Sequence, residues 1–343
     1  MKAHASKAVT IKDVAARAGV SIATVSRVIN QNDSVNPKLA EQVERAIAEL
    51  NYTPNSLARG LKSSSTHMIA YLVSNISDPF FVKIAEGIEN HIRKYNFSLI
   101  VCSTNNSKET EAAYINLLRE KKVDGLIINT TGYNDELISE VSNQIPTVLS
   151  NRRIINARFQ GDFIDRDNLT GSADLAKHLL SLGHRRIGII NGPSHLSTAH
   201  ERYLGFFNTM RAAGVPMGLS SSYCYEGLFT KESGYRGAEM LMLQPSPPTA
   251  IVCMSSEISL GAMQYFVRNR IVIPRDVSIA CFDSLPNWEV LCVQPTVVFS
   301  DLTVLGDKMG ELLLERIDSY ETIPNREIRF TTQLLMGNSS APL

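Results

Sequence analysis

The feature that most constrains the fold is an alternation of short apolar runs with longer amphipathic segments between residues 68 and 282. Strands that are apolar throughout belong to parallel sheets covered by helices on both faces. The apolar runs are 68–73, 99–102, 126–128, 187–190, 250–254 and 278–282, and the helical segments are 79–95, 108–120, 137–144, 198–213, 231–243 and 257–268. We therefore predict an α/β core with two parallel sheets.

A different pattern begins near the N-terminus, where residues 10–30 indicate two short helices separated by Gly19. Thr10 and Asp13 have the spacing of a capping box, which starts a helix. Gly19 is suited to the left-handed turn that ends one. The apolar residues of this first helix have i, i+3, i+4, i+7 spacing: Ile11, Val14, Ala15 and Ala18.

The second short helix has an apolar side and a small, polar or basic side. Ser21 is placed to cap it. Val25, Val28 and Ile29 are expected to point inward. The opposite face consists of Ile22, Ala23, Ser26, Arg27 and Asn30.

A third helix is expected from Pro37, and the short turn between the first two helices is typical of a helix-turn-helix, whose second helix enters the major groove. Arg27 would then bind a guanine edge, while Ile22 and Ala23 offer apolar contact to a thymine methyl. The third helix places Leu39, Val43, Ala46, Ile47 and Leu50 on one side. An ordinary helical hairpin with a solvated polar face is the alternative.

The continuation of this segment carries a family resemblance. The runs V-S-x-A-T-V-S-R-V-I-N at 20–30 and N-Y-x-P-N-x-x-A-R-x-L at 51–61 stand in tandem. In this the chain resembles the lactose/galactose repressor (LacI/GalR) family of bacterial transcription regulators, and the resemblance extends over nearly its whole length. It implies a regulator, most often a repressor, that binds a near-palindromic double-stranded DNA operator as a homodimer. The residues expected to contact DNA are Ser21, Ile22, Ala23, Thr24, Ser26, Arg27, Asn30, Tyr52, Asn55, Ala58 and Leu61.

Residues 55–62 are long enough for only two helical turns, which are marginal in isolation. We expect this segment to become helical on DNA, and the 63–66 stretch to form a flexible linker. The resemblance implies a hinge helix that pairs with its dimer mate in the minor groove, where Leu61 wedges into a base step. Residues 1–62 thus form the predicted helix-turn-helix domain.

For the rest of the chain, the resemblance implies a periplasmic-binding-protein-like core of two Rossmann-like lobes joined by three chain crossings. The expected N-terminal lobe is 66–165 with 297–324, and the expected C-terminal lobe is 166–296 with 325–343. Ligands of open α/β sheets bind beyond the carboxyl ends of the strands. A small-molecule effector, sugar-like in character, is therefore expected between the lobes.

Several residues directly follow predicted strands or match the family's pocket positions. Phe80 and Phe81 follow the first run, and Asp283 follows another. Arg202, Asp167 and Phe229 are assigned by the resemblance. Each residue has a structural alternative: the phenylalanines as core, Arg202 as a surface ion pair, and the aspartates as helix caps.

The chain departs from its relatives at Ser255-Ser256, where they usually carry Asn-Asp. Ser255 is retained as an effector-binding candidate and can also cap the next helix. The change removes a carboxylate that often binds sugar hydroxyls, which makes a hexose effector less secure. Trp288, the only tryptophan, could stack on a ligand or simply pack.

The zero net charge hides an asymmetry between the two parts of the chain. Residues 1–62 contain nine Lys and Arg against five Asp and Glu, a net of +4, which leaves −4 for the remainder. A basic head on an acidic body fits a DNA-binding module attached to a different kind of domain. No run approaches a membrane span and no secretory signal is recognisable, so a cytoplasmic location is expected. The five cysteines show no metal-ligand spacing and are expected to be buried, reduced thiols.

An enzyme is the least supported class. The chain has no G-x-G-x-x-G, G-x-x-x-x-G-K-[ST] or G-x-S-x-G motif, so no catalytic residue, cofactor or metal is assigned. A sugar-binding protein without DNA activity is the main alternative to the regulator, and it would require a defective head. The tail after Gln333 is too short for a tetramerising coiled coil, which favours a dimer.

Overall fold

A computed structural model describes residues 9–29, 35–50, 52, 65–156, 158–215, 221–319 and 323–343. The chain divides into two compact units, Met1–Thr66 and His67–Leu343, at the predicted linker. Each unit has a hydrophobic core of its own. The predicted hinge helix at 55–62 lies outside the described residues, as does Asn30.

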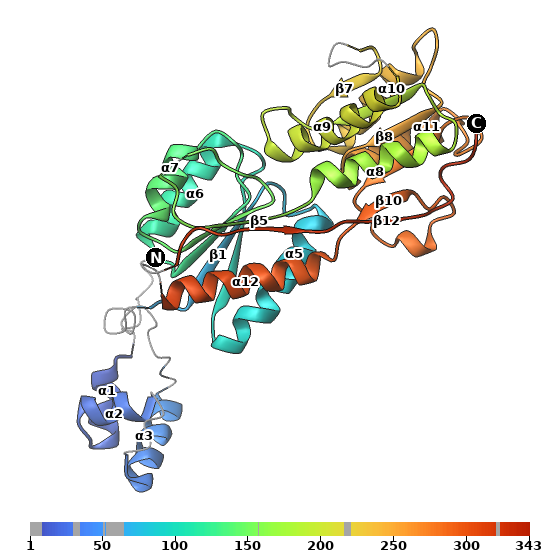
Figure 1. The fold of residues 1–343 in the computed structure, drawn as a ribbon. Coiled ribbons are helices and arrows are strands. Elements are labelled where there is room, and N and C mark those ends of the chain that lie inside the picture. The colour runs from blue at the N-terminus through green and yellow to red at the C-terminus, as the bar shows by residue number, and fades with distance from the viewer. Residues whose placement is uncertain are drawn as a thin grey trace, which may run out of the picture. The chain divides into compact units, whose positions relative to one another are not determined.

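The first unit contains three short helices around one small core (Figure 1): α1 (Ile11–Ala18), α2 (Ile22–Ile29) and α3 (Pro37–Glu49). The Asp13 carboxylate accepts hydrogen bonds from the Thr10 amide and hydroxyl, both at 2.7 Å. Gly19 adopts φ 68° in the left-handed region and ends α1. The buried core side chains are Val14, Ala15, Val25, Val43 and Ala46. Leu39, which was predicted to face this core, is instead 37% exposed in the first turn of α3.

The first lobe of the second unit is built on a six-stranded parallel sheet in the order β11-β5-β4-β3-β1-β2. Its strands are β1 (Met68–Val73), β2 (Ser98–Ser103), β3 (Gly125–Ile128), β4 (Thr147–Ser150), β5 (Asp162–Arg166) and β11 (Glu327–Phe330). Its helices are α5 (Pro79–Ile92), continued by the 3₁₀ turn η1 (Arg93–Tyr95), α6 (Lys108–Glu120), α7 (Asp135–Ser142) and α12 (Leu302–Asp318). Separate apolar clusters join α5 and α12 to one face and α6 and α7 to the other.

The second lobe contains a six-stranded sheet in the order β12-β10-β9-β8-β6-β7, in which only the β10–β12 pair is antiparallel. Its strands are β6 (Ile187–Asn191), β7 (Cys224–Glu226), β8 (Ala250–Cys253), β9 (Ser278–Phe282), β10 (Thr296–Phe299) and β12 (Gln333–Leu335). Its helices are α8 (Asn168–Ser181), α9 (Ser197–Ala212), α10 (Lys231–Met242) and α11 (Ser256–Arg268), with a 3₁₀ turn η2 (Trp288–Val290). Helices α8 and α9 cover one face, and α10 and α11 cover the other.

Two of the three predicted chain crossings are misplaced. Strand β10 belongs to the second sheet, because Val297 pairs with Cys281 of β9, so the chain leaves this lobe after residue 299 and not at 297. Strand β11 belongs to the first sheet, because Ile328 pairs with Ile164 of β5, so the last crossing follows residue 330 and not 324. The first crossing follows β5, which ends at Arg166, close to the predicted boundary.

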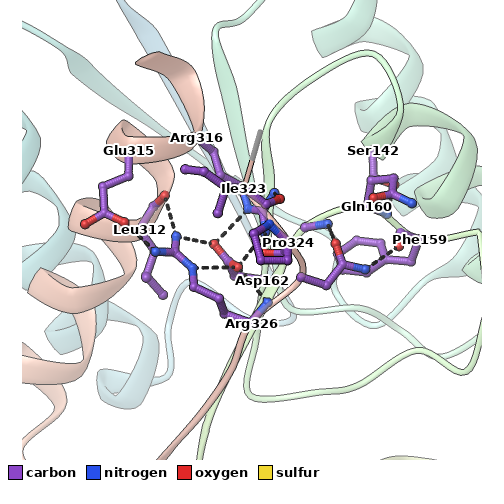
Figure 2. Close-up of polar contacts among 12 residues, drawn as sticks. Ser142, Phe159, Gln160, Asp162, Leu312, Glu315, Arg316, Ile323, Pro324 and Arg326 are labelled. Atoms are coloured by element: carbon purple, nitrogen blue, oxygen red, sulfur yellow. Dashed lines mark hydrogen bonds and ion pairs between the residues drawn. The ribbon is translucent and has the colours of Figure 1, made fainter. Parts of the chain in front are cut away.

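A buried polar cluster fastens α12 to the N-terminal end of β5 (Figure 2). The Asp162 carboxylate is fully buried and accepts hydrogen bonds from Arg316 of α12 and from Arg326, which precedes β11. Arg316 also donates to the Ile323 and Pro324 carbonyls. One carboxylate therefore joins β5 to two segments that lie 154 and 164 residues later in the chain.

The described helices include none long and apolar enough to cross a membrane. The cysteines differ partly from expectation: Cys102, Cys253 and Cys281 are buried free thiols, whereas Cys224 is half-buried and Cys292 is exposed.

Candidate functional site

The outward face of α2 carries the side chains predicted to read DNA. Ile22 is 45% exposed, and Ala23 and Arg27 are also exposed, while Val25 on the opposite side is completely buried. Arg27 forms no ion pair with any residue that the structure describes. An exposed isoleucine beside an unpaired arginine gives this face both an apolar contact and a charged hydrogen-bond donor.

The remaining described residues of the predicted DNA set support the helix or its flank. The Ser21 hydroxyl accepts a hydrogen bond from the Thr24 amide at 3.1 Å and caps α2, and it also lies 2.9 Å from the Thr24 hydroxyl. Ser26 is half-buried, and Tyr52 packs against the head core. The other predicted residues of this set, Asn30, Asn55, Ala58 and Leu61, lie outside the described residues.

In the second unit, residues that follow strands of one sheet contact residues that follow strands of the other. Arg166, at the end of β5, forms an ion pair with Asp283, directly after β9. The guanidinium carbon of Arg152, after β4, lies 5.9 Å from the ring centre of Phe229. The carboxyl ends of the two sheets therefore meet, which is where the effector site was predicted.

Arg202 is deeply buried rather than placed on the surface. It is 3% exposed, its Nε donates to Asn168 Oδ1 at 2.8 Å, and its Nη1 donates to the Met254 carbonyl at 2.6 Å. Its guanidinium carbon lies 3.8 Å from the Phe282 ring centre and 5.8 Å from that of Phe229. The alternative that Arg202 forms a surface ion pair is therefore wrong.

Only one of the two predicted phenylalanines reaches the cavity at the site. Both are buried in the core cluster of the first lobe, and their ring centres lie 5.0 Å apart. Phe80 also lies 4.7 Å from the Arg166 guanidinium carbon and lines a cavity of about 430 Å³ together with Asp283, Ser256 and Trp288. Phe81 is absent from this lining, so the structure brings Phe80, but not Phe81, to the site.

Asp167 and Ser255 serve as helix caps. Asp167 accepts a hydrogen bond from the Thr170 amide at 2.9 Å at the start of α8, and Ser255 accepts one from the Ile258 amide at 3.2 Å at the start of α11. Trp288 donates its indole N–H to the Pro295 carbonyl at 2.8 Å while lining the cavity. These contacts explain the positions of the three residues without a ligand.

A larger open depression, of about 880 Å³, lies beside α7 and is lined by residues from Gly132 to Asn143 and by Arg158. It contains none of the predicted effector residues. The smaller cavity beside Asp283 is the one that adjoins the meeting point of the two sheets.

Burial shifts the titration of several groups around Arg166. It raises the pKa of the Asp165 carboxyl to about 7 despite the opposing effect of Arg166, and it raises that of Asp78 to about 6. Burial also lowers the pKa of Arg152 and of Arg202 to about 10, so both guanidinium groups remain charged at neutral pH.

Comparison with known families accounts for both units. Residues 10–55 match the family described as bacterial regulatory proteins, lacI family, and residues 66–336 match periplasmic binding proteins and sugar binding domain of LacI family. The chain belongs to the LacI family. The HTH-type transcriptional repressor PurR of Haemophilus influenzae (strain PittEE) is 34% identical over 310 residues, which cover 90% of this chain and 91% of that repressor.

Solved structures of LacI-family regulators share the fold. The transcriptional regulator CelR in complex with cellobiose is 28% identical, with a TM-score of 0.73 over 97% of this chain and 100% of CelR. The lac repressor dimer bound to operator and the anti-inducer ONPF is 24% identical, with a TM-score of 0.84 over 98% of this chain and 100% of that one. At that identity the second likeness shows the fold alone.

Sequence reasoning missed Arg152 and Arg166 of this LacI-family core. Arg152 follows β4 and Arg166 ends β5, two strands that the pattern of apolar runs did not predict. The signal was nevertheless present: once β5 is recognised, Arg166 stands at its carboxyl end, where the ligand of an open sheet is expected.

Proposed function

We propose that this chain is a sequence-specific DNA-binding transcriptional repressor whose operator binding is controlled by a small effector, sugar-like in character, bound between the two lobes. The observation that carries the proposal is the exposed pair Ile22 and Arg27 on α2, whose opposite side closes the head core through Val25. The family's regulatory head and the repressor relatives support it.

For the DNA site, we propose that Arg27 forms a bidentate contact with a guanine and that Ile22 and Ala23 contact bases through apolar surface. Ser21, Thr24, Ser26 and Asn30 would position α2 on the groove and backbone. A homodimer would place two such helices on a near-palindromic operator. Tyr52, Asn55, Ala58 and Leu61 are proposed for the hinge.

For the effector site, we propose Phe80, Arg202, Phe229 and Asp283 as contact residues, with Asp167 and Ser255 at its margin as helix caps. The contacts between the ends of the two sheets support a site that both lobes must complete. An effector that favours one arrangement of the lobes would alter operator affinity through a coupling free energy of about 1–3 kcal/mol. No catalytic role is proposed.

In the decisive experiment, the full chain is used to select DNA duplexes from a random library. Gel shifts then compare how strongly the unmodified chain and its variants bind the selected duplex. We expect Arg27→Ala to lose about 10-fold or more in affinity for the selected duplex, consistent with 1–3 kcal/mol for a base contact. Arg45→Ala is the matched control, because Arg45 is an exposed arginine of α3 paired with Glu41 at 3.1 Å. Equal retention by Arg27→Ala and the unmodified chain would refute base reading, and a head without DNA affinity would favour a sugar-binding protein.

A further inference from the structure

Three buried guanidinium groups meet where the lobes touch. Arg152, Arg166 and Arg202 are 4%, 1% and 3% exposed. The guanidinium carbons of Arg166 and Arg202 lie 5.3 and 3.8 Å from the Phe282 ring centre, and those of Arg152 and Arg202 lie 5.9 and 5.8 Å from the Phe229 ring centre. Besides burial, Arg166 and Arg152 each lower the pKa of Arg202, so the buried charges repel one another and require negative charge or hydrogen-bond acceptors around them.

Only one of the three arginines forms an ion pair with a described carboxylate. Arg166 pairs with Asp283, whereas Arg152 and Arg202 form no ion pair with any described residue. Arg152 donates to the Thr130 carbonyl at 2.9 Å and the Asn106 amide oxygen at 3.3 Å, both neutral acceptors. Asp78, Glu111 and Asp165 lie close enough to influence the arginines electrostatically, but they form no ion pair with them. Most N–H groups of the three arginines therefore have no direct carboxylate partner among the described residues.

The arginines also present donors without acceptors. Arg166 Nε and Nη2 and Arg152 Nε are buried and have no hydrogen-bond partner among the described residues. The same pair of donors, Nε and Nη2, has a carboxylate partner elsewhere in the chain: in Arg316 they bind the two oxygens of Asp162 at 2.8 and 2.7 Å. This fork matches the two oxygens of a carboxylate or phosphate.

Unpartnered acceptors surround the same region. The side-chain amide oxygens of Asn129, Asn151 and Asn191 are buried without a described partner, and these residues follow β3, follow β4 and end β6, respectively. Such oxygens accept hydrogen bonds from hydroxyl groups. A matching ligand would therefore carry hydroxyls as well as an anionic group.

We propose that the effector is a small hydroxylated anion, such as a sugar phosphate or a sugar acid, whose charged group binds Arg166 and Arg152. This inference rests on the proposed function, since it names the effector class of the same cleft. A neutral sugar would offer separate hydroxyl acceptors, which match the two adjacent donors of Arg166 less well than the paired oxygens of a carboxylate or phosphate.

The anionic effector is tested by measuring how tightly the full chain binds neutral sugars and the charged forms of the same sugars. Titration calorimetry would compare glucose, glucose 6-phosphate and gluconate, then ribose and ribose 5-phosphate, with inorganic phosphate alone as the control for simple anion binding. We expect at least one phosphorylated or carboxylated member to bind 10-fold or more tightly than its neutral counterpart and than inorganic phosphate. Which anionic form binds distinguishes a phosphate from a carboxylate.

Substitutions locate the charged group. Arg166→Gln and, independently, Arg152→Gln should reduce the preference for the anion at least 10-fold, and circular dichroism would show which variants remain folded. Arg236→Gln, in an exposed pair with Glu232 on α10, should leave the preference unchanged. A neutral sugar that binds as tightly as its anionic counterpart would overturn the proposal, as would failure of every anionic member to bind at millimolar concentration.

The gel shift separates this inference from the proposed function. A chain that retains its selected duplex yet shows no anion preference refutes the anionic effector and leaves the DNA-binding function intact. A chain that binds the anion but retains no duplex supports the ligand class and refutes the regulatory role.

Discussion

Arg316 binds Asp162 through two adjacent N–H groups of its guanidinium, with Nε 2.8 Å from Oδ2 and Nη2 2.7 Å from Oδ1. Both side chains are almost completely buried. Arg326 adds a second guanidinium to the same carboxylate (Figure 2). Burial alone would raise the pKa of Asp162, but the hydrogen bonds from the two arginines outweigh it and lower the pKa. The pair therefore holds α12 against β5 as a charged unit.

Arg316→Met should destabilise the second unit by about 3–5 kcal/mol, because it leaves a buried carboxylate with less compensation. Chemical denaturation followed by circular dichroism measures the loss. Arg236→Met provides the control, since Arg236 is 66% exposed and its pair with Glu232 contributes little. If both substitutions lowered stability equally, the buried pair would have no special structural role.

The contact between α5 and α12 depends on glycines that allow the backbones to approach closely. A Cβ added at Gly87 would lie 2.1 Å from the Thr303 carbonyl oxygen, and one at Gly306 would lie 2.1 Å from that of Ile84. Gly87→Ala should therefore reduce the free energy of unfolding by about 1–3 kcal/mol despite the better helix propensity of alanine. Glu86→Ala, at the neighbouring exposed position, should have little effect in the same thermal denaturation, and equal melting temperatures for the two variants would contradict the close contact.

The head was predictable because its signals are local. Capping residues, Gly19 and the i, i+3, i+4 spacing act within a few residues, and the structure shows α1, α2 and α3 close to the predicted positions. Leu39 was the exception, since a residue in the first turn of α3 lies beyond the reach of the small core.

The core was less predictable where charge is buried. Strand β5 reads DFIDR, and its Asp162 and Arg166 are buried against partners that are distant in the sequence: Arg316 and Arg326 for Asp162, and Asp283 for Arg166. Hydrophobic periodicity cannot identify such a strand, because the acceptability of each charge depends on a partner elsewhere in the chain. Because β5 was not predicted, Arg166 was not predicted as a site residue. Phe80 and Asp283 were identified, because they follow apolar strands.

Leu61→Ala tests the hinge that the resemblance implies, in a segment outside the described residues. The substitution removes an apolar wedge but no charge, so binding to the selected duplex should weaken while nonspecific affinity stays nearly constant. Gel shifts on the selected and on scrambled duplexes measure the two affinities at one salt concentration. Arg59→Ala is the companion variant, since loss of a charge should weaken both; matched losses on both duplexes for Leu61→Ala would count against the wedge.

Asp165 should make stability depend on pH near neutrality. Its carboxyl has a pKa of about 7 in the folded chain, raised by burial, against about 3.9 when unfolded. The folded state therefore holds more protons between roughly pH 4 and 7, and its free energy of unfolding falls as pH rises through this window. The stabilising contribution is complete below about pH 4 and is lost above the folded pKa.

Asp165→Asn should remove this dependence while retaining an oxygen that can accept the Arg166 amide, now 2.7 Å from Asp165 Oδ1. Urea unfolding at pH 5, 6, 7 and 8 should show a smaller decline for the variant than for the unmodified chain, whatever its absolute stability. Comparing the two chains cancels the opposite contribution of His178 and His184, whose pKa values burial lowers. Asp174→Asn, which removes a carboxylate paired with Lys177 on α8, should keep the original slope. Parallel slopes for all three chains would show that Asp165 does not titrate in this range.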